Sequence, residues 1–379
     1  MEKDINLGIA GKIAGYIRGN GATVYLIRIS KLRPPCKLLG GICMKRFMNS
    51  PDKYIDEMLE GILKAHPNRL RSVTEDRRAI VRREAPIQNK VGIATGGGSG
   101  HLPIFMGYVG RGLLDGAAIG NIFSSPNPSQ MLEVTKAIHG GKGVLYLYGN
   151  YDGDIWNFDL AAELADAMGI RVESIRVADD VASAPKHDQD KRRGIAGLFF
   201  AYKVAGAKAM SEAGLDEVVQ TTKKALAGIR SMGVALSSCS LPAVGTPIFT
   251  IGDNEMEIGM GIHGEPGIER RELLSADEVT EIVLTKILED LPYRSGSEVA
   301  VLVNGLGATP KEELYIIFNR VFDLLHMRGI RVFRSYVGEF ATSLEMAGCS
   351  ITLMLLDEEL KALLAAPAST PFFCQSHDY

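Results

Sequence analysis

Between residues 55 and 63, apolar residues recur at the spacing of a helix. Side chains of this kind stand three or four positions apart, on one face of a helix: Ile55, Met58, Leu59, Ile62 and Leu63. Ser50 and Pro51, directly before them, are residues that favour the first turn of a helix. The pattern predicts a helix that begins at Pro51.

Beyond this helix, short apolar runs alternate with helical patterns. Runs at 90–95, 143–149 and 171–177 predict buried strands, and a helical pattern at 159–168 separates the last two. Strand–helix–strand alternation is typical of parallel pairing in an α/β sheet.

A second set of strands follows a mostly helical stretch at 190–232. Apolar runs predict these strands and one helix among them: strands 247–251, 256–262, 298–303, 330–337 and 349–356, and helix 311–326. We therefore predict an α/β protein with two α/β domains, each with a central sheet flanked by helices. The expected domains are 44–235 and 236–379.

Residues 1–43 do not share this pattern. They contain a basic, irregular stretch at 28–37, and the apolar run at 22–27 is shorter than the apolar region of a secretory signal. We expect a disordered extension here, with a targeting segment as the alternative.

The bulk composition argues against several classes of protein. Of 379 residues, 46% are hydrophobic and 23% are charged, with a formal net charge of -3, as in soluble globular proteins. Without a basic excess, nucleic acid is not an expected partner. No apolar run reaches the roughly 20 residues of a membrane span. The five cysteines form no CxxC pair, which favours a reducing cytoplasm over a disulfide framework.

Three polar loops follow predicted strands, at 96–101, 150–154 and 261–264. Ligands of open α/β sheets bind beyond the carboxyl ends of strands, so these loops are the first candidates for chemistry. The run Gly96–Gly100 lacks the Gly-Lys-Ser/Thr ending of a P-loop, yet its bare backbone lets a small polar ligand approach. A tight turn is the alternative, and His101 directly after it projects into whatever the loop lines.

The other two loops each hold one candidate residue. Asp154 is either a general base or a turn former that bonds its own backbone. Gly259 to Gly264 match GxGxxG, but Glu265-Pro266-Gly267 would break the helix that a dinucleotide site needs, which argues against a dehydrogenase. His263 is an accessible nucleophile or a structural residue. His, Cys and Asp residues do not occur together at the sequence spacing that metal ligands show, so no metal site is predicted.

Together these strings resemble the substrate-binding subunit of the dihydroxyacetone kinase family. The resemblance covers Met44 to about Phe373, and the string Gly-Ile-His-Gly-Glu-Pro-Gly at 261–267 is highly specific to that family. The other matching segments are 96–101, 122–126, 150–154, 157–158, 192–194, 306–310 and 342–344.

The resemblance implies a role for each candidate residue. His263 would attack the ketone carbon of a short ketose and form a hemiaminal. Asp154 would be the base for the hydroxyl that accepts phosphate, and His101 would hydrogen-bond and polarise the bound ketose. The glycine-rich stretch would line the same pocket: Gly97, Gly98, Ser99 and Gly100.

The resemblance also implies partners. Since the chain shows no nucleotide-binding signature, Mg²⁺ and ATP or ADP are expected on a separate DhaL-type subunit, and no cofactor on this chain. Whether that nucleotide exchanges or is recharged by a phosphocarrier relay stays open. A homodimer is implied as well. Arg192 and Arg193 lie where family members meet the nucleotide subunit, or form a solvated charge cluster with Lys191.

Three positions depart from the family pattern. Leu102 replaces a frequent glutamate, Gly149 a frequent lysine and Asp152 a frequent threonine. These changes alter the charge near the pocket and favour a tetrulose such as erythrulose over dihydroxyacetone as the substrate. A ketose-sensing regulator without catalysis is the alternative from another class. The presence of all three candidate site residues favours the enzyme.

Overall fold

The computed structural model describes residues 46–376, which belong to one compact unit, Met44–Tyr379. The extension expected at 1–43 lies outside the described residues. In the described part of the chain, no helix is long and apolar enough to cross a membrane.

Six strands form the first sheet, in the order β1-β2-β4-β3-β5-β6. Their bounds are Leu70–Ser72 (β1), Ala79–Arg82 (β2), Gly92–Ser99 (β3), Gly116–Ile122 (β4), Val144–Gly149 (β5) and Val172–Val177 (β6). β4, β3, β5 and β6 run parallel, and β1 and β2 add an antiparallel edge. The predicted strands at 90–95, 143–149 and 171–177 are confirmed. β4 consists largely of glycine and alanine, and its two isoleucines, Ile119 and Ile122, do not make the continuous run of large apolar side chains by which a buried strand is predicted.

Helices pack on both faces of this sheet, with α3 and α4 on one face and α5 and α6 on the other. The predicted helix at Pro51 is confirmed as a 3-10 turn that leads into α2. The helices and 3-10 turns of this part are Pro51–Lys53 (η1), Tyr54–Ala65 (α2), Phe105–Tyr108 (η2), Pro128–Ile138 (α3), Asp152–Asp166 (α4), Lys186–Lys191 (η3), Leu198–Met210 (α5) and Leu215–Ala227 (α6).

The second sheet also has six strands, in the order β11-β10-β12-β7-β8-β9. Only β10 and β11 are parallel; the other neighbours are antiparallel. The bounds are Ile229–Ala235 (β7), Glu255–Ile258 (β8), Glu269–Glu272 (β9), Glu298–Gly305 (β10), Arg331–Gly338 (β11) and Gly348–Leu356 (β12). The remaining elements are Ala276–Asp290 (α7), Lys311–Met327 (α8), Glu358–Ala365 (α9) and the short hairpin Ala368–Ser369 (β13) with Cys374–Gln375 (β14).

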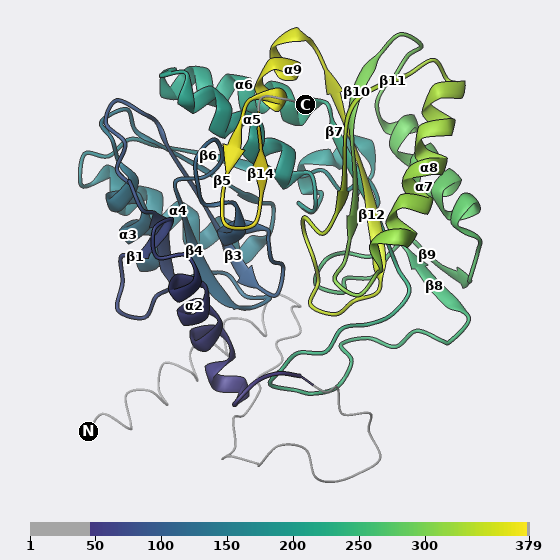
Figure 1. Cartoon of the computed structure of the whole chain (residues 1–379), viewed down its shortest axis with the longest axis horizontal. Coiled ribbons are helices and arrows are strands. Elements are labelled where there is room, and N and C mark those ends of the chain that lie inside the picture. The colour runs from purple at the N-terminus through teal and green to yellow at the C-terminus, as the bar shows by residue number, and fades with distance from the viewer. Residues whose placement is uncertain (1–45, 377–379) are drawn as a thin grey trace. The chain divides into compact units, whose positions relative to one another are not determined.

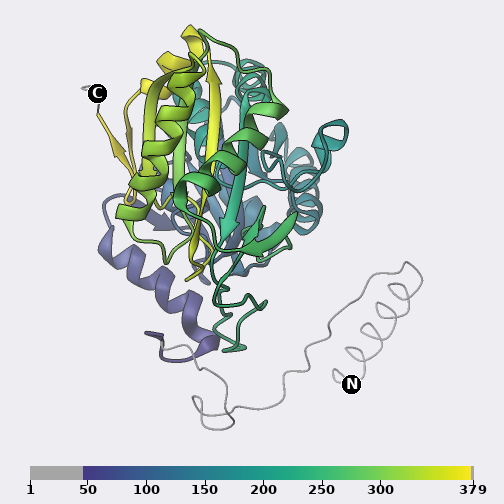
Figure 2. The ribbon, with the colours of Figure 1, turned by 90° about the vertical axis from the view of Figure 1, so that its right-hand side faces the viewer.

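The described unit is layered, with the two sheets facing each other across α5 and α6 (Figure 1). One core cluster joins the sheets, because it holds Ile93 and Leu145 of the first sheet together with Leu302 of the second. α7 and α8 cover the outer face of the second sheet, where Figure 2 shows them in front of its strands. The predicted class, two α/β units with sheets flanked by helices, is confirmed.

The glycine-rich run is part of a strand rather than a turn. Gly96 to Ser99 continue β3, and all are buried. A Cβ on Gly97 would lie 2.3 Å from the ring of Phe105, and one on Gly98 would lie 2.5 Å from the backbone nitrogen of Ser124. Glycine is therefore required by close packing on both sides of the strand.

Two further expectations need correction. The boundary expected at 235 falls after β7, yet β7 pairs with β12 and β8 and so belongs to the second sheet. The strand expected at 247–251 is wrong: apart from a bridge between Ser240 and Pro247, this segment is a loop. The strand expected at 256–262 ends at Ile258, because Gly259 takes a left-handed φ of 84°.

Candidate active site

The three candidate residues come from separate elements and meet between the two sheets. His101 follows β3, Asp154 lies in the first turn of α4, and His263 lies in the loop between β8 and β9. The rings of His101 and His263 are 4.7 Å apart between centroids, at an interplanar angle of 83°. The charge of His263 also acts on the carboxyl of Asp154. The structure thus brings together the residues that the sequence suggested.

The segment 150–154 was expected as a loop, but the helix begins earlier than the pattern indicated. α4 starts at Asp152, with both Asp152 and Asp154 in its first turn. Acidic residues stabilise this end of a helix because the exposed N–H groups there carry partial positive charge. Asp152 is exposed, whereas Asp154 is buried.

The loop that carries His263 is folded tightly by its glycines. The N–H of Gly261 donates to the carbonyl of Glu265 (3.1 Å), and that of Gly264 donates to the carbonyl of Gly261 (3.1 Å). A Cβ on Gly261 would lie 2.1 Å from a carboxylate oxygen of Glu265. The glycine therefore lets Glu265 fold back onto the histidine. The next helix, α7, begins only at Ala276, so no dinucleotide-binding helix follows this loop.

Glu265 holds His263 by two hydrogen bonds. Its Oε1 lies 2.9 Å from His263 Nδ1, and its Oε2 accepts from the His263 backbone N–H at 2.9 Å. Burial acts to raise the pKa of Glu265, but the hydrogen bond and charge of His263 outweigh it and lower the pKa to about 2. The ionised carboxylate can only accept, so in the neutral form of the ring the proton sits on Nδ1 and Nε2 keeps its lone pair. The His263 side chain is 22% exposed, which leaves the ring accessible.

Arg193 ties this loop to the first half of the chain. Its Nε donates to Asp180 (2.9 Å), its Nη2 donates to the carbonyl of Gly259 (3.0 Å), and its Nη1 lies 4.0 Å from Glu265 Oε2. The guanidinium adds to the lowering of the pKa of Glu265. Because this group is engaged within the fold, a solvated charge cluster does not describe it; its contact with a nucleotide subunit stays a prediction.

Arg192, its neighbour, is 1% exposed and has a different role. Two of its nitrogens donate to the two carboxylate oxygens of Asp290, at 2.9 and 2.6 Å, and Arg230 binds the same carboxylate. Bidentate pairs of this kind fix geometry strongly. Arg192 is thus a buried structural residue, and the hypothesis of a solvated charge cluster is wrong for it.

His101 is a neutral, buried histidine. Its Nδ1 lies 2.8 Å from the carbonyl oxygen of Thr342, which can only accept, so Nδ1 carries the proton. Burial, together with the charge of His263, lowers its pKa to about 3. Its Nε2 is buried and has no hydrogen-bond partner among the described residues. Nε2 can therefore accept a hydrogen bond from a ligand.

Asp154 has a similar unused atom. It is 7% exposed, and its Oδ1 lacks a hydrogen-bond partner within residues 46–376. Burial raises its pKa to about 6, against the opposing effects of a hydrogen bond from Ser125 and the charge of His263. Buried polar atoms are rarely unsatisfied in native proteins. Two of them beside one accessible imidazole fit a small ligand with several hydroxyl groups.

Aromatic rings wall the site. Phe123 stacks on His101 with centroids 4.7 Å apart at 16°, and its ring meets that of His263 edge-on at 5.2 Å. Tyr151 also meets His263 edge-on, at 4.7 Å, while its hydroxyl donates to the carbonyl of Gly194 (3.1 Å). These contacts hold both imidazoles in place.

Backbone strain concentrates at the same place. Phe105, Phe123 and Leu344 all have left-handed φ values, of 66°, 53° and 53°. Bulky residues adopt this conformation only where the surrounding structure imposes it, most often at functional sites. Phe105 packs on Gly97, and Leu344 packs on Gly100, so the strained residues surround the segment that leads into His101.

The glycine-rich stretch lines a small cavity beside His101. The cavity has a volume of about 20 Å³, and its lining includes the predicted residues Gly97, Gly98, Ser99 and Gly100. That is room for about one water molecule. The Ser99 hydroxyl donates to the carbonyl of Gly120 at 2.8 Å. Substrate binding by this stretch stays a prediction.

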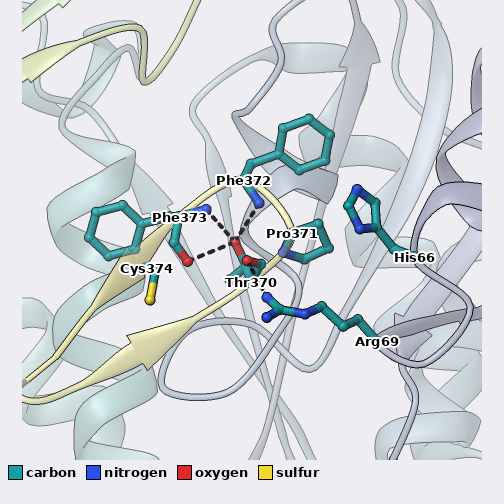
Figure 3. Close-up of a pocket in the computed structure, with 7 residues that line it drawn as sticks. All are labelled: His66, Arg69, Thr370, Pro371, Phe372, Phe373 and Cys374. Atoms are coloured by element: carbon teal, nitrogen blue, oxygen red, sulfur yellow. Dashed lines mark hydrogen bonds between the residues drawn. The ribbon is translucent and has the colours of Figure 1, made fainter.

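A larger open cavity of about 470 Å³ lies between the end of α2 and the β13–β14 hairpin (Figure 3). None of the candidate site residues lines it. Arg69 donates to the carbonyl of Thr370 (2.7 Å), and the Thr370 hydroxyl accepts from the backbone N–H groups of Phe372 (3.2 Å) and Phe373 (2.9 Å). These hydrogen bonds of Arg69 and Thr370 hold the hairpin.

Several site residues have no role in the sequence hypothesis: Phe123, Tyr151, Thr342 and Glu265. Glu265 had a visible signal, since it stands two residues after His263 in the glycine-rich string. The other three are reached only through tertiary contacts. Within residues 46–376, no group of three or more His, Cys, Asp and Glu residues could hold a metal ion.

Known proteins resemble this chain over most of its length. The dihydroxyacetone-binding subunit DhaK of the PTS-dependent dihydroxyacetone kinase 2 of Listeria innocua is 44% identical, over 87% of this chain and 99% of that protein. The L-erythrulose kinase of Pectobacterium atrosepticum is 41% identical, over 87% of this chain and 56% of that enzyme. The chain thus spans little more than half of the erythrulose kinase.

Two solved structures share the fold. The dihydroxyacetone kinase of C. freundii matches with a TM-score of 0.81 at 33% identity, over 87% of this chain and 60% of that one. The dihydroxyacetone kinase operon co-activator Dha-DhaQ matches with a TM-score of 0.80 at 30% identity, over 85% of this chain and 99% of that one. A family model described as the Dak1 domain matches residues 60–372. The chain therefore belongs to the Dak1 domain family, as a relative of the dihydroxyacetone-binding subunits of dihydroxyacetone kinases.

Proposed function

We propose that this chain is the ketose-binding subunit of a dihydroxyacetone-kinase-type enzyme, and that it holds a short ketose covalently on His263. One observation carries the proposal. Glu265 binds Nδ1 of His263 and leaves Nε2 free, in a site shared with His101 and Asp154.

The covalent step balances with one proton exchanged through solvent. The Nε2 lone pair of His263 forms a bond to the carbonyl carbon, and the π electrons of the C=O bond move to oxygen, which takes up a proton from solvent. The Nδ1 proton passes to Glu265 and from there to solvent, which leaves a neutral hemiaminal and an ionised Glu265. Binding energy is limited to about 1.5 kcal/mol per heavy atom for tiny ligands, and a reversible covalent bond exceeds this limit. Polyols such as glycerol have no carbonyl and are rejected.

Asp154 and His101 then orient the bound ketose. Asp154 takes the proton of the substrate hydroxyl as its oxygen bonds to phosphorus and the bond to the leaving group breaks. Fixed orientation contributes roughly 7–11 kcal/mol to such reactions. His101 accepts a hydrogen bond from a ketose hydroxyl through Nε2. Polarising the carbonyl by donation would need a second proton on this ring, which its pKa of about 3 opposes.

The phosphoryl donor comes from a partner in this proposal. Mg²⁺ and ATP or ADP belong to a separate DhaL-type subunit, and this chain binds no cofactor of its own. The relatives that support this include a protein named as the dihydroxyacetone-binding subunit of a kinase. A cytoplasmic homodimer fits the same relatives.

A ketose-sensing regulator is the second candidate, because a co-activator shares the fold. Both candidates require ketose binding, but only the kinase needs a base beside the substrate. The raised pKa of Asp154, at about 6, suits a general base and favours the kinase. Intact-protein mass spectrometry after incubation with a ketose tests the binding that both share; phosphate transfer in the presence of a nucleotide-loaded partner separates them.

Substrate choice gives the first prediction. Asp152 is exposed, whereas Leu102 contributes to the apolar core and Gly149 is buried beside the Tyr151 ring. Without the family's charged side chains at the last two positions, we expect a higher kcat/KM for erythrulose than for dihydroxyacetone. Steady-state kinetics with both ketoses and one partner subunit measure this. A preference for dihydroxyacetone would remove the tetrulose hypothesis and leave the kinase intact.

A second prediction concerns Glu265. In Glu265→Gln, the amide can donate to Nδ1 and so shift the imidazole proton to Nε2, which abolishes the nucleophilic lone pair. We expect the rate of adduct formation to fall roughly 10²-fold or more, by analogy with carboxylates that fix a catalytic tautomer. Time-resolved mass spectrometry gives the rate.

The matched control is Glu257→Gln in the same hairpin. Glu257 accepts from the Gly267 N–H (3.0 Å) and from Arg270 (2.8 Å), but it does not contact His263. Its loss should change stability rather than the rate of adduct formation. Equal rates for wild type and Glu265→Gln would mean that Glu265 does not set the tautomer.

A further inference from the structure

The segment between β11 and β12 contacts both loops that carry a candidate histidine. Its residues 342–344 are among the strings that resemble the family, yet the proposed chemistry uses none of their side chains. The carbonyl oxygen of Thr342 lies 2.8 Å from His101 Nδ1, and the N–H of Leu344 donates to the carbonyl of Gly100 at 2.8 Å. Backbone groups of this segment therefore hold the loop of His101.

Ser343, between these two residues, reaches the other loop with its side chain. Its hydroxyl donates to the carbonyl oxygen of Ile262, at 2.5 Å. A carbonyl oxygen can only accept, so the direction of this hydrogen bond is fixed. Ser343 is 0% exposed, and a hydrogen bond in such surroundings is stronger than one in water.

The peptide unit between Ile262 and His263 is thus held on both sides. Its carbonyl accepts from Ser343, and its N–H donates to Glu265 Oε2 at 2.9 Å. The other oxygen of the same carboxylate lies 2.9 Å from His263 Nδ1. Because a peptide unit is planar, rotation of the carbonyl also turns the N–H away from Glu265. The Ser343 hydroxyl therefore acts on the imidazole through this peptide and Glu265.

Ser343 is itself held by its neighbours. Its N–H donates to the carbonyl of Leu306 (2.8 Å), and its carbonyl accepts from the N–H of Met346 (3.0 Å). The Sγ of Cys239 lies 3.7 Å from the Ser343 Oγ. Since the single hydroxyl proton goes to Ile262, the thiol is the donor in this contact. These contacts keep the hydroxyl directed at the loop of the nucleophile.

We propose that Ser343 is a positioning residue, whose hydroxyl fixes the peptide between Ile262 and His263 and so keeps the imidazole in the orientation that attacks a ketose. The inference rests on the proposed function, since it concerns the attack by His263. Ser343 acts through this peptide and Glu265 rather than on the ketose itself. Without the hydroxyl, the buried carbonyl of Ile262 loses this partner and the peptide gains freedom to rotate.

Ser343→Ala removes this one oxygen atom. Time-resolved intact-protein mass spectrometry with dihydroxyacetone and with erythrulose measures the rate of adduct formation. We expect this rate to fall at least roughly tenfold, since a misplacement of about 1 Å can cost about 10²-fold. The matched control is Ser231→Ala, because Ser231 is also 0% exposed and its Oγ lies 2.7 Å from Thr352 Oγ1, between β7 and β12. This variant should keep the wild-type rate.

The proton on His263 Nδ1 gives a readout that a general loss of stability would not move. An N–H that a carboxylate binds resonates far downfield in the proton NMR spectrum, and the signal of His263 is the one that His263→Ala lacks. In Ser343→Ala this signal should move upfield or exchange away. Ser231→Ala should keep it, and so should Ser343→Thr, which retains a hydroxyl and should form the adduct faster than Ser343→Ala.

A wild-type rate in Ser343→Ala would overturn the proposal, and a slower rate with an unshifted signal would exclude the route through Glu265. Equal losses of rate in Ser343→Ala and Ser231→Ala would also reject it, since stability alone would then explain both. So would a rate in Ser343→Thr no higher than in Ser343→Ala. Absence of the adduct from wild type would instead reject the proposed function.

Discussion

The ketose adduct that wild type is expected to form should be absent from His263→Ala. In this proposal only His263 offers a nitrogen lone pair that is both accessible and held in position. His101 is 1% exposed and lies beside it, but its Nε2 is placed to accept a hydrogen bond. Removal of the imidazole deletes the bond-forming atom, so phosphoryl transfer should fall below detection together with the adduct.

Intact-protein mass spectrometry measures the adduct as a mass increase equal to one ketose. His187→Ala is the matched control, because the side chain of His187 is 81% exposed and lies in the 3-10 turn η3, outside the site. An adduct of unchanged amount in His263→Ala would place the covalent bond on another residue and reject the mechanism. An adduct lost in both variants would indicate a general loss of fold.

Asp154→Asn should separate binding from transfer. The amide keeps the size of the carboxyl and leaves His263 in place, so the adduct should form as in wild type. Phosphoryl transfer should slow by roughly 10²- to 10⁴-fold, the usual contribution of a positioned general base. Single-turnover measurement of phosphate transfer, with the adduct quantified in the same sample, gives both quantities. An unchanged transfer rate would remove Asp154 from this role.

The pH profile gives a second readout for Asp154. Its pKa is raised to about 6, and a general base acts only in its ionised form. The transfer rate in wild type should therefore be full above this pKa and decline as pH falls through about 6. Asp154→Asn should lack this decline. Asp152→Asn is exposed and in the same helical turn, so it should keep the wild-type profile.

Much of the local structure was readable from the chain itself. Large apolar runs predicted β3, β5 and β6, and three-and-four spacing predicted α2, since these patterns reflect burial directly. The glycine run was more ambiguous, because glycine marks both turns and sites of close packing. Here Gly97 and Gly98 lie in a strand that Phe105 and the backbone of Ser124 approach closely.

The site was only partly predictable for a different reason. His101, Asp154 and His263 stand in polar segments that follow strands, so position along the chain points to them. Phe123, Tyr151 and Thr342 contribute through contacts that depend on how two sheets pack, and no local pattern encodes that packing. The strand pairing of β7 shows the same limit, since its partner β12 lies more than a hundred residues away.

The hydrogen bond between His101 and Thr342 spans 241 positions and joins the two sheets of the unit. Arg193 makes a second such link, to the turn that holds His263. The geometry of the reactive groups thus depends on the contact between the two sheets rather than on either sheet alone. A substitution that shifts one sheet against the other by about 1 Å would lower activity strongly, although every reactive group remained chemically intact. Mutational scans should therefore find inactivating changes far from any group that touches substrate.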